Sequence, residues 1–249
     1  MTTPRIYFPR QFEPGEELEL DEQNTHYLRN VLRLKSGEKV RLFGKADGEY
    51  EAVVTDAASK QLKVTVVNRL PGAAGGAVRI TLAQSLPKTD KMDLIVQKAT
   101  ELGADRVVPF VSSRSIPVLT PEKARRRRER WQKIALEASR QCRRPDIPEV
   151  AEVIPFDRML ESAAEPDLKL ILWEEESGTK IKSALKASRA DAITVTIGPE
   201  GGFSPEEVEA ARARGFIPVS LGSQVLKTET AALAALAIIQ YEKGIFGAE

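Results

Sequence analysis

The chain is poor in the residues from which metal sites and disulfides are built. Among its 249 residues it has one cysteine, Cys142, and one histidine, His26. A single cysteine cannot form an intramolecular disulfide, which favours a protein of a reducing compartment. The counts exclude a site made of several histidines or of a cysteine cluster, and a zinc site made mainly of carboxylates would be unusual. We therefore expect no metal centre.

Long apolar runs and an excess of charge of one sign are also missing. The longest apolar stretch, residues 231–239, is too short to cross a bilayer. The first residues lack the basic and then apolar pattern of a secretion signal. We therefore expect a cytoplasmic protein with no membrane partner. Because the formal net charge is only +1, a nucleic acid would have to be held by a local concentration of positive charge.

The first part of the chain has the period of β-strands. Residues 39–43, 50–54 and 61–67 each alternate apolar and polar side chains, as half-buried strands do. Glycine and aspartate in the intervening residues 44–48 supply turn chemistry. Three successive strands with short turns predict a small β-barrel or curled sheet. One helical piece, at residues 26–32, interrupts this pattern.

The rest of the chain alternates between two periods. Five short apolar segments between residues 79 and 221 are separated by segments of helical period, which predicts an α/β domain with a mainly parallel sheet. Residues 70–76 are rich in glycine and alanine and have little to pack, so we expect a linker there. The sequence therefore predicts two domains, at residues 1–72 and 73–249.

Positive charge is concentrated in one predicted helix. From Lys123 to Arg144 the chain carries ten lysines or arginines against two acidic residues, Glu129 and Glu137. Most charge runs are solvated surface helices, but their charges usually alternate in sign. The one-sided excess favours RNA or another polyanion as a partner.

A glycine-rich loop joins a predicted strand to a predicted helix. Residues 193–197 are apolar, three glycines follow between residues 198 and 202, and a capping box at residues 204–207 begins the helix. Ligands bind at strand ends in open α/β sheets. The spacing fits neither a dinucleotide fingerprint nor a P-loop, and a plain βα turn explains this loop alone equally well. Residues 221–231 repeat the order of strand, glycine, polar loop and helix.

Together these segments resemble the SPOUT superfamily of RNA methyltransferases, and within it the ribosomal RNA small subunit methyltransferase E family. The motifs that carry the resemblance lie in the same order along nearly the whole chain, at residues 26–33, 97–103, 113–115, 130–141, 197–203 and 221–231. The resemblance implies a trefoil-knotted, mainly parallel sheet domain preceded by a small PUA-like β-barrel that binds RNA. It also implies S-adenosylmethionine as cofactor, a homodimer, and methylation of N3 of a uridine in bacterial 16S ribosomal RNA, either free or in the small ribosomal subunit.

The resemblance also assigns site residues by position. The cofactor pocket would use Leu172, Ile197, Gly198, Glu200, Gly201, Leu221, Gly222, Leu226, Thr228 and Ala231. Apart from the resemblance, our candidates for binding the RNA are the basic residues Arg29, Arg33, Lys88, Arg114, Arg140, Arg143 and Arg144.

Three residues are candidates for catalytic roles. Arg114 could stabilise negative charge that develops on the base, although a surface ion pair would explain it as well. Glu200 or Glu229 could serve as a base or as an orienting acceptor. Hydrogen bonds of a loop or of a helix start are an equally good interpretation of both carboxylates.

Two positions depart from the family's pattern. Gln224 and Lys227 stand where arginine is common. Lysine keeps the charge but lacks the planar guanidinium fork, and glutamine has no charge. Two alternatives therefore stay open: a SPOUT methyltransferase for another RNA position, and an RNA-binding assembly factor that has lost catalysis. The basic helix and the β-rich domain disfavour a third, an enzyme for a small phosphorylated metabolite.

Overall fold

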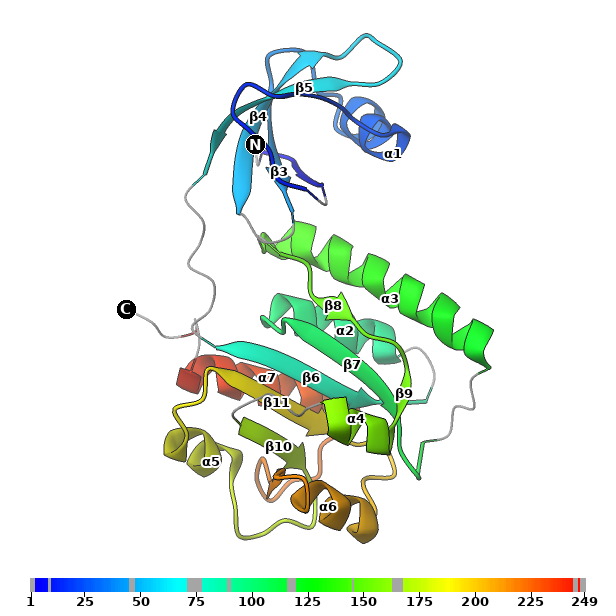
Figure 1. The fold of residues 1–249 in the computed structure, drawn as a ribbon, viewed down its shortest axis with the longest axis vertical. Coiled ribbons are helices and arrows are strands. Elements are labelled where there is room, and N and C mark those ends of the chain that lie inside the picture. The colour runs from blue at the N-terminus through cyan, green and yellow to red at the C-terminus, as the bar shows by residue number, and fades with distance from the viewer. Residues whose placement is uncertain are drawn as a thin grey trace. The chain divides into compact units, whose positions relative to one another are not determined.

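The computed structural model describes residues 3–8, 10–44, 48–70, 78–88, 91–115, 120–144, 146–162, 168–243 and 246. The chain divides into two compact units (Figure 1). The first contains Met1–Gly75 and Ser139–Ile147, and the second contains Gly76–Ala138 and Pro148–Glu249. The predicted boundary near residue 72 lies outside the described residues, as does most of the predicted linker. The sequence did not indicate that residues 139–147 group with the first unit.

The first unit is built on a five-stranded sheet. Its strands are β1 (Arg5–Tyr7), β2 (Glu17–Glu19), β3 (Lys39–Phe43), β4 (Glu49–Asp56) and β5 (Lys63–Arg69), in the order β1-β3-β4-β5-β2. β1 is parallel to β3, and the other pairs are antiparallel. β3, β4 and β5 confirm the three strands predicted from alternation. The predicted helical piece is α1 (Glu22–His26) followed by one π-helical turn, η1 (Tyr27–Val31).

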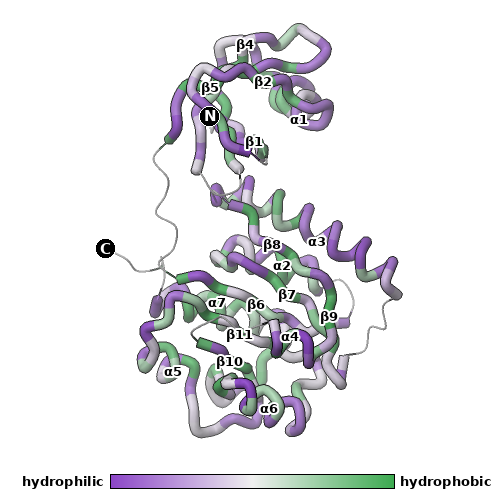
Figure 2. The backbone as a smooth tube through the Cα atoms, viewed as in Figure 1, coloured by the Kyte–Doolittle hydropathy of each residue, from purple (hydrophilic) through white to green (hydrophobic). Residues whose placement is uncertain are grey.

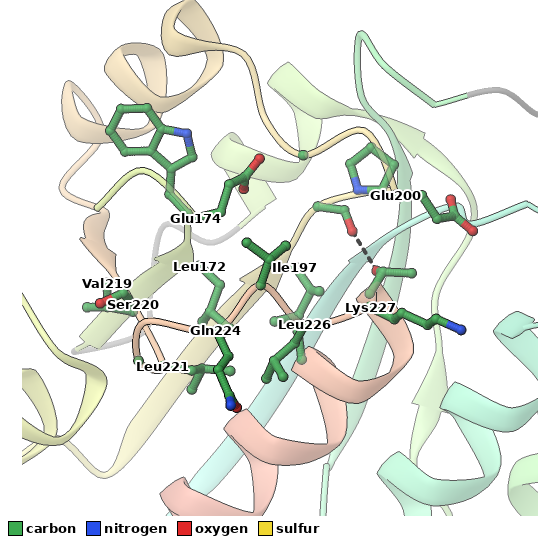
Figure 3. Close-up of a pocket in the computed structure, with 18 of the residues that line it drawn as sticks. Leu172, Glu174, Ile197, Glu200, Val219, Ser220, Leu221, Gln224, Leu226 and Lys227 are labelled. Atoms are coloured by element: carbon green, nitrogen blue, oxygen red, sulfur yellow. Dashed lines mark hydrogen bonds between the residues drawn. The ribbon is translucent and has the colours of Figure 1, made fainter. Parts of the chain in front are cut away.

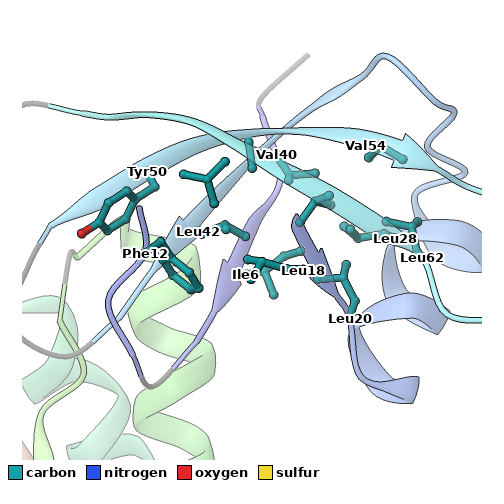
Figure 4. Close-up of a cluster of buried hydrophobic side chains, with 13 residues drawn as sticks. Ile6, Phe12, Leu18, Leu20, Leu28, Val40, Leu42, Tyr50, Val54 and Leu62 are labelled. Carbon is teal, nitrogen blue, oxygen red and sulfur yellow. The ribbon is translucent and has the colours of Figure 1, made fainter. Parts of the chain in front are cut away.

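Alternation determines which face of this sheet is buried. The inward positions of the strands meet Leu28 of η1 and residues of the flanking loops in one apolar cluster (Figure 4), formed by Ile6, Phe12, Leu18, Leu20, Leu28, Val40, Leu42, Tyr50, Ala52, Val54, Leu62, Val64 and Val66. At the end of β3 the backbone of Gly44 lies against Phe8, and a Cβ at Gly44 would overlap the Phe8 carbonyl oxygen. No other residue type fits at Gly44 without a backbone shift.

The second unit is built on a seven-stranded sheet. Its strands are β6 (Arg79–Ser85), β7 (Arg106–Val111), β8 (Glu149–Val150), β9 (Ile154–Pro155), β10 (Leu168–Leu172), β11 (Ala192–Ile197) and β12 (Ile217–Val219). The order is β12-β10-β11-β6-β7-β8, with β9 also paired to β7. All pairs of these described strands are parallel, as predicted. β6, β10 and β11 are buried along most of their length, as expected for strands covered on both faces.

Helices cover the sheet of the second unit. They are α2 (Lys91–Glu101), α4 (Phe156–Ser162), α5 (Ile181–Ala187), α6 (Pro205–Arg212) and α7 (Thr228–Lys243). α3 (Pro121–Cys142) also begins in this unit, and its residues 139–142 group with the first unit. α7 packs against α2, α5, β6 and β11, whereas α4 and α6 contribute to a separate aromatic-rich core. In the described parts of the chain no helix has the length and apolarity needed to span a bilayer. The trefoil knot implied by the resemblance stays a prediction.

Candidate functional site

A cavity of about 300 Å³ lies at the carboxyl ends of three neighbouring strands (Figure 3). Leu172, Ile197 and Val219 are the last residues of β10, β11 and β12, and all three line it. Because the strands are parallel, their ends and the loops that follow meet at one edge of the sheet. All the residues predicted for the cofactor line this cavity except Gly201.

The cavity has apolar walls and a loop with unused polar backbone groups. Leu172, Ile197, Leu221 and Leu226 form much of the wall. Within the described residues, none of the backbone N–H groups of residues 222–226 donates a hydrogen bond. Apolar walls with a few convergent polar groups are typical of small-molecule sites. The arrangement suits a flat ring that carries hydrogen-bonding atoms at its edge.

Buried hydrogen bonds fix the floor of the cavity. Thr228, the first residue of α7, donates its hydroxyl to the Gly198 carbonyl at 2.6 Å and accepts from Gln84 Nε2 at 3.0 Å. Thr228 and Gln84 are both buried. The relay therefore joins β6, the loop after β11 and the start of α7. Gln84 was not among the predicted site residues, although a glutamine within a buried strand such as β6 is a signal that could have found it.

A second network holds the loop that carries Arg114. Arg114 Nη1 donates to the Gly201 carbonyl at 2.9 Å, beside the cavity. The neighbouring Ser113 N–H donates to Glu207 Oε1 at 2.8 Å, and the Ser204 N–H donates to Glu207 Oε2 at 3.0 Å. The predicted capping box of α6 is present. Its glutamate has a second role that the sequence did not show, because it also anchors the Arg114 loop.

The two candidate catalytic carboxylates lie together. Lys91 Nζ is 3.1 Å from Glu200 Oε1 and 3.1 Å from Glu229 Oε2. The Lys88 N–H donates to both oxygens of Glu200, at 3.1 and 3.2 Å. Partial burial works to raise the pKa of the Glu200 carboxyl, but its own N–H, the Lys88 N–H and the Lys91 ammonium together lower that pKa. The pKa of Glu229 is also lowered, since its own N–H and Lys91 outweigh its burial. Both groups are therefore carboxylates at neutral pH.

Known proteins match this chain over nearly its whole length. A family model described as an RNA methyltransferase domain matches residues 75–240, and one described as an RNA methyltransferase PUA domain matches residues 20–67. The ribosomal RNA small subunit methyltransferase E of Bacillus subtilis is 31% identical over 94% of this chain and 93% of its own length. The enzyme of that name from Synechocystis is 36% identical over 86% of this chain and 69% of its own.

The chain belongs to the ribosomal RNA small subunit methyltransferase E family. Solved structures agree with this assignment. The family's enzyme from Neisseria gonorrhoeae, bound to S-adenosyl methionine, is 32% identical, covers 98% of this chain and 99% of its own, and has a TM-score of 0.86. A methyltransferase from Legionella pneumophila in complex with the same cofactor is 33% identical, covers 99% and 100%, and has a TM-score of 0.88.

The RNA-binding residues expected for a methyltransferase E chain fall in both units. Lys88 and Arg114 lie near the cavity, on the loops after β6 and β7. The others belong to the first unit and are Arg29, Arg33, Arg140, Arg143 and Arg144. Arg33 and Arg143 are exposed and adopt left-handed backbone conformations, with φ of 57° and 63°. Such conformations are uncommon outside glycine and asparagine.

Part of the charge on the basic helix α3 is used inside the protein. Figure 2 shows hydrophilic residues along α3. Arg130 pairs with Asp93 of α2, which also accepts from the buried Trp131 Nε1 at 3.1 Å. Arg128 Nε donates to the Val150 carbonyl at 3.0 Å. Other basic side chains of α3, such as Arg125, are exposed. A polyanion partner for α3 stays a prediction.

Thr228 offers a direct test of the floor of the cavity. We expect Thr228→Val to lower the free energy of unfolding by about 2 kcal/mol, because it leaves the Gly198 carbonyl and the Gln84 amide buried without this partner. Thermal denaturation should show the midpoint falling by roughly 4–8 °C. Thr228→Ser keeps the hydroxyl and is the matched control. Equal stability of the valine and serine variants would contradict the relay.

Proposed function

We propose that this protein transfers a methyl group from S-adenosylmethionine to N3 of a uridine in small-subunit (16S) ribosomal RNA. The observation that carries the proposal is the cavity at the ends of β10, β11 and β12, in a chain of the methyltransferase E family. Two solved relatives more than 30% identical to this chain are bound to S-adenosylmethionine. The substrate is 16S ribosomal RNA, free or within the small ribosomal subunit, which implies a cytoplasmic protein.

The residues of the cavity fit the cofactor. Leu172, Ile197, Leu221 and Leu226 would hold the adenine ring, and the unused N–H groups of residues 222–226 would bind its edge. A Cβ at Gly198 would lie 3.2 Å from two carbons of the Phe203 ring, a tight contact that would require that ring to shift by a few tenths of an ångström. When bound, S-adenosylmethionine supplies an electrophilic methyl group. Everything else must come from the protein as positioning and charge.

The side chains around the cavity suit methylation of a base nitrogen. N3 lies on the Watson–Crick edge of uridine, so the base has to be unpaired or flipped out. The N3 proton must leave as the N–C bond forms, which places negative charge on O2 and O4. Arg114 uses one N–H on the Gly201 carbonyl and has other donors for that charge. Glu200 lines the cavity and is an ionised acceptor for the N3–H, and Glu229 is a second ionised carboxylate beside it.

The first unit would take part in binding the RNA. The PUA-type family model matches residues 20–67, which supports this role and the domain division predicted near residue 72. The five basic residues expected there would contact phosphates and fix the register of the RNA, while Lys88 and Arg114 act near the base.

A homodimer is part of the proposal. On α7 the apolar residues Ala231, Ala234, Ile238 and Tyr241 lie at helical spacing and are not fully buried, and Tyr241 is 70% exposed. Ala231 also lines the cavity, and Val225 in the loop before α7 is 82% exposed. A continuous apolar stripe of this kind is typical of a protein interface. A second copy bound here would lie beside the cofactor site.

Nucleoside mass spectrometry of small-subunit rRNA tests the proposed reaction. Cells that lack the gene should lose N3-methyluridine, and the wild-type gene should restore it. Loss of a different methylated nucleoside would reject N3 and show a methyltransferase for another position. If no nucleoside changed, a binding protein without catalysis would be favoured. Gln224, which lines the cavity where arginine is expected, would then be the first residue to exchange.

A further inference from the structure

Lys91 joins three segments that are distant in the sequence. It is the first residue of α2, Glu200 lies in the loop after β11, and Glu229 lies in the first turn of α7. One ammonium contacts both carboxylates at 3.1 Å. Neither the sequence motifs nor the proposed mechanism gives Lys91 a role, yet it touches both carboxylates that the mechanism uses.

The two oxygens of Glu200 differ in their contacts with the described residues. Glu200 Oε1 meets Lys91 Nζ and the Lys88 N–H, both at 3.1 Å, whereas Oε2 accepts from the Lys88 N–H at 3.2 Å, and the carboxylate also interacts with its own N–H. An ionised carboxylate has about four lone-pair sites, so Oε2 can accept a further hydrogen bond. The Glu200 side chain is 25% exposed and lines the cavity. In Figure 3 the Glu200 carboxylate points away from the other side chains that line the cavity, so a ligand would reach it at the edge of the cavity.

The two carboxylates differ in what they can offer. Glu229 Oε2 is buried and makes the Lys91 ion pair without a well-directed hydrogen bond. Glu229 is not part of the cavity lining. Through Lys91, Glu229 therefore acts on Glu200 and not directly on a ligand.

We propose that Lys91 is a positioning residue, which holds Glu200 against the cavity as an ionised acceptor for the N3–H of the target uridine. The proposal rests on the proposed function and adds how the base is chosen. Uracil presents N–H at N3, whereas cytosine presents an acceptor there. A fixed carboxylate therefore accepts uracil and repels cytosine, since two acceptors facing each other leave both unpaired.

The charges around the cluster determine how its protonation responds to pH. One ammonium faces two carboxylates, so the cluster of Lys91, Glu200 and Glu229 has a net negative charge. The pKa of Glu200 is lowered by its own N–H, the Lys88 N–H and Lys91, and the pKa of Glu229 is lowered by its own N–H, Lys91 and Lys227. The pKa of Lys91 is itself raised by Glu200 and Glu229, so it stays protonated. Removing its charge must raise the pKa of Glu200, and protonated Glu200 would appear at higher pH than in the wild type.

The test is Lys91→Met, which keeps the length of the side chain and removes the charge. We expect methyl transfer to fall by roughly 10- to 100-fold with S-adenosylmethionine affinity within about twofold by calorimetry. The acid limb of the pH–rate profile should move to higher pH, and carboxyl-carbon NMR of the free protein should show the Glu200 pKa raised. Lys91→Arg should recover part of the rate. The control is Lys98→Met, which removes an ion pair to Glu101 on the same helix.

A double-mutant cycle separates positioning from a general structural role. If Lys91 acts through Glu200, Lys91→Met should change the rate by less than about twofold in a Glu200→Gln background. Independent, multiplying losses would overturn the proposal, as would an unchanged Glu200 pKa in Lys91→Met. Full activity of Lys91→Met would reject the role of Lys91 and leave the proposed function intact. A wild-type protein that methylates no uridine would instead reject the proposed function.

Discussion

Replacing Glu200 by glutamine is expected to lower the rate of methyl transfer by at least ~100-fold, the contribution typical of a positioned acid–base group. Glutamine preserves the volume and can still accept from the Lys88 N–H, whose two contacts to Glu200 are at 3.1 and 3.2 Å. It has no charge, cannot take a proton, and can turn an amide N–H toward the N3–H. Single-turnover transfer to a 16S rRNA fragment measures the effect directly.

The same variant decides between two roles for Glu200. Glu200 lines the cavity, and the sequence predicts it both as a catalytic and as a cofactor-binding residue. If the carboxylate serves the base, the affinity of Glu200→Gln for S-adenosylmethionine should stay within about twofold of the wild type. A large loss of affinity with little loss of rate at saturation would assign Glu200 to the cofactor instead. Glu209→Gln on the exposed face of α6 is the control and should behave as the wild type.

The secondary-structure elements, and the edge of the sheet at which the site lies, could be predicted from the sequence. Alternation in β3 to β5 and apolar segments between helices follow from the periods of strands and helices. Parallel strands bring their carboxyl ends to one edge, so the loops after β11 and β12 were expected to meet. Their residues do line one cavity.

The hydrogen bonds inside the site between residues that are distant in the sequence could not be predicted in this way. Gln84 and Thr228 are 144 residues apart, Lys88 and Glu200 are 112 apart, and Ser113 and Glu207 are 94 apart. A periodic pattern shows which face of an element is buried but not which residue of another element it meets. Lys91 illustrates this, because at the start of a helix it looks like an ordinary solvated lysine until Glu200 and Glu229 are placed beside it.

The charge run of α3 shows the opposite limit of sequence reasoning. Read from the sequence, its excess of arginine is one feature with one predicted purpose. In the structure Arg130 and Trp131 meet Asp93 of α2, and Arg128 binds the Val150 carbonyl. On the charged face of one helix, some side chains make apolar or polar contacts inside the protein, and others are available to bind a partner. A net count of charge cannot separate the two groups.

Tyr241→Glu is expected to convert the proposed homodimer to a monomer at micromolar concentration. Tyr241 is 70% exposed on α7, so the folded monomer loses little packing. In a two-fold symmetric interface each substitution occurs twice. If Tyr241 is a contact worth about 2 kcal/mol per copy, the dimer dissociation constant should rise on the order of 10³-fold. Sedimentation equilibrium over a range of concentrations measures this shift.

The effect of Tyr241→Glu on cofactor binding distinguishes between two kinds of interface. One only stabilises the dimer, and the other also completes the cofactor site. The apolar stripe of α7 begins at Ala231, which lines the cavity, so a partner on this stripe lies within reach of the cofactor site. We expect the monomeric variant to lose cofactor affinity together with the dimer, and to regain it at high protein concentration. Val67→Glu places the same charge on a 47% exposed apolar residue of β5 and should leave the dimer intact. A Tyr241→Glu protein that remains dimeric would remove α7 from the interface, because a buried unpaired carboxylate there could not be tolerated without a large cost.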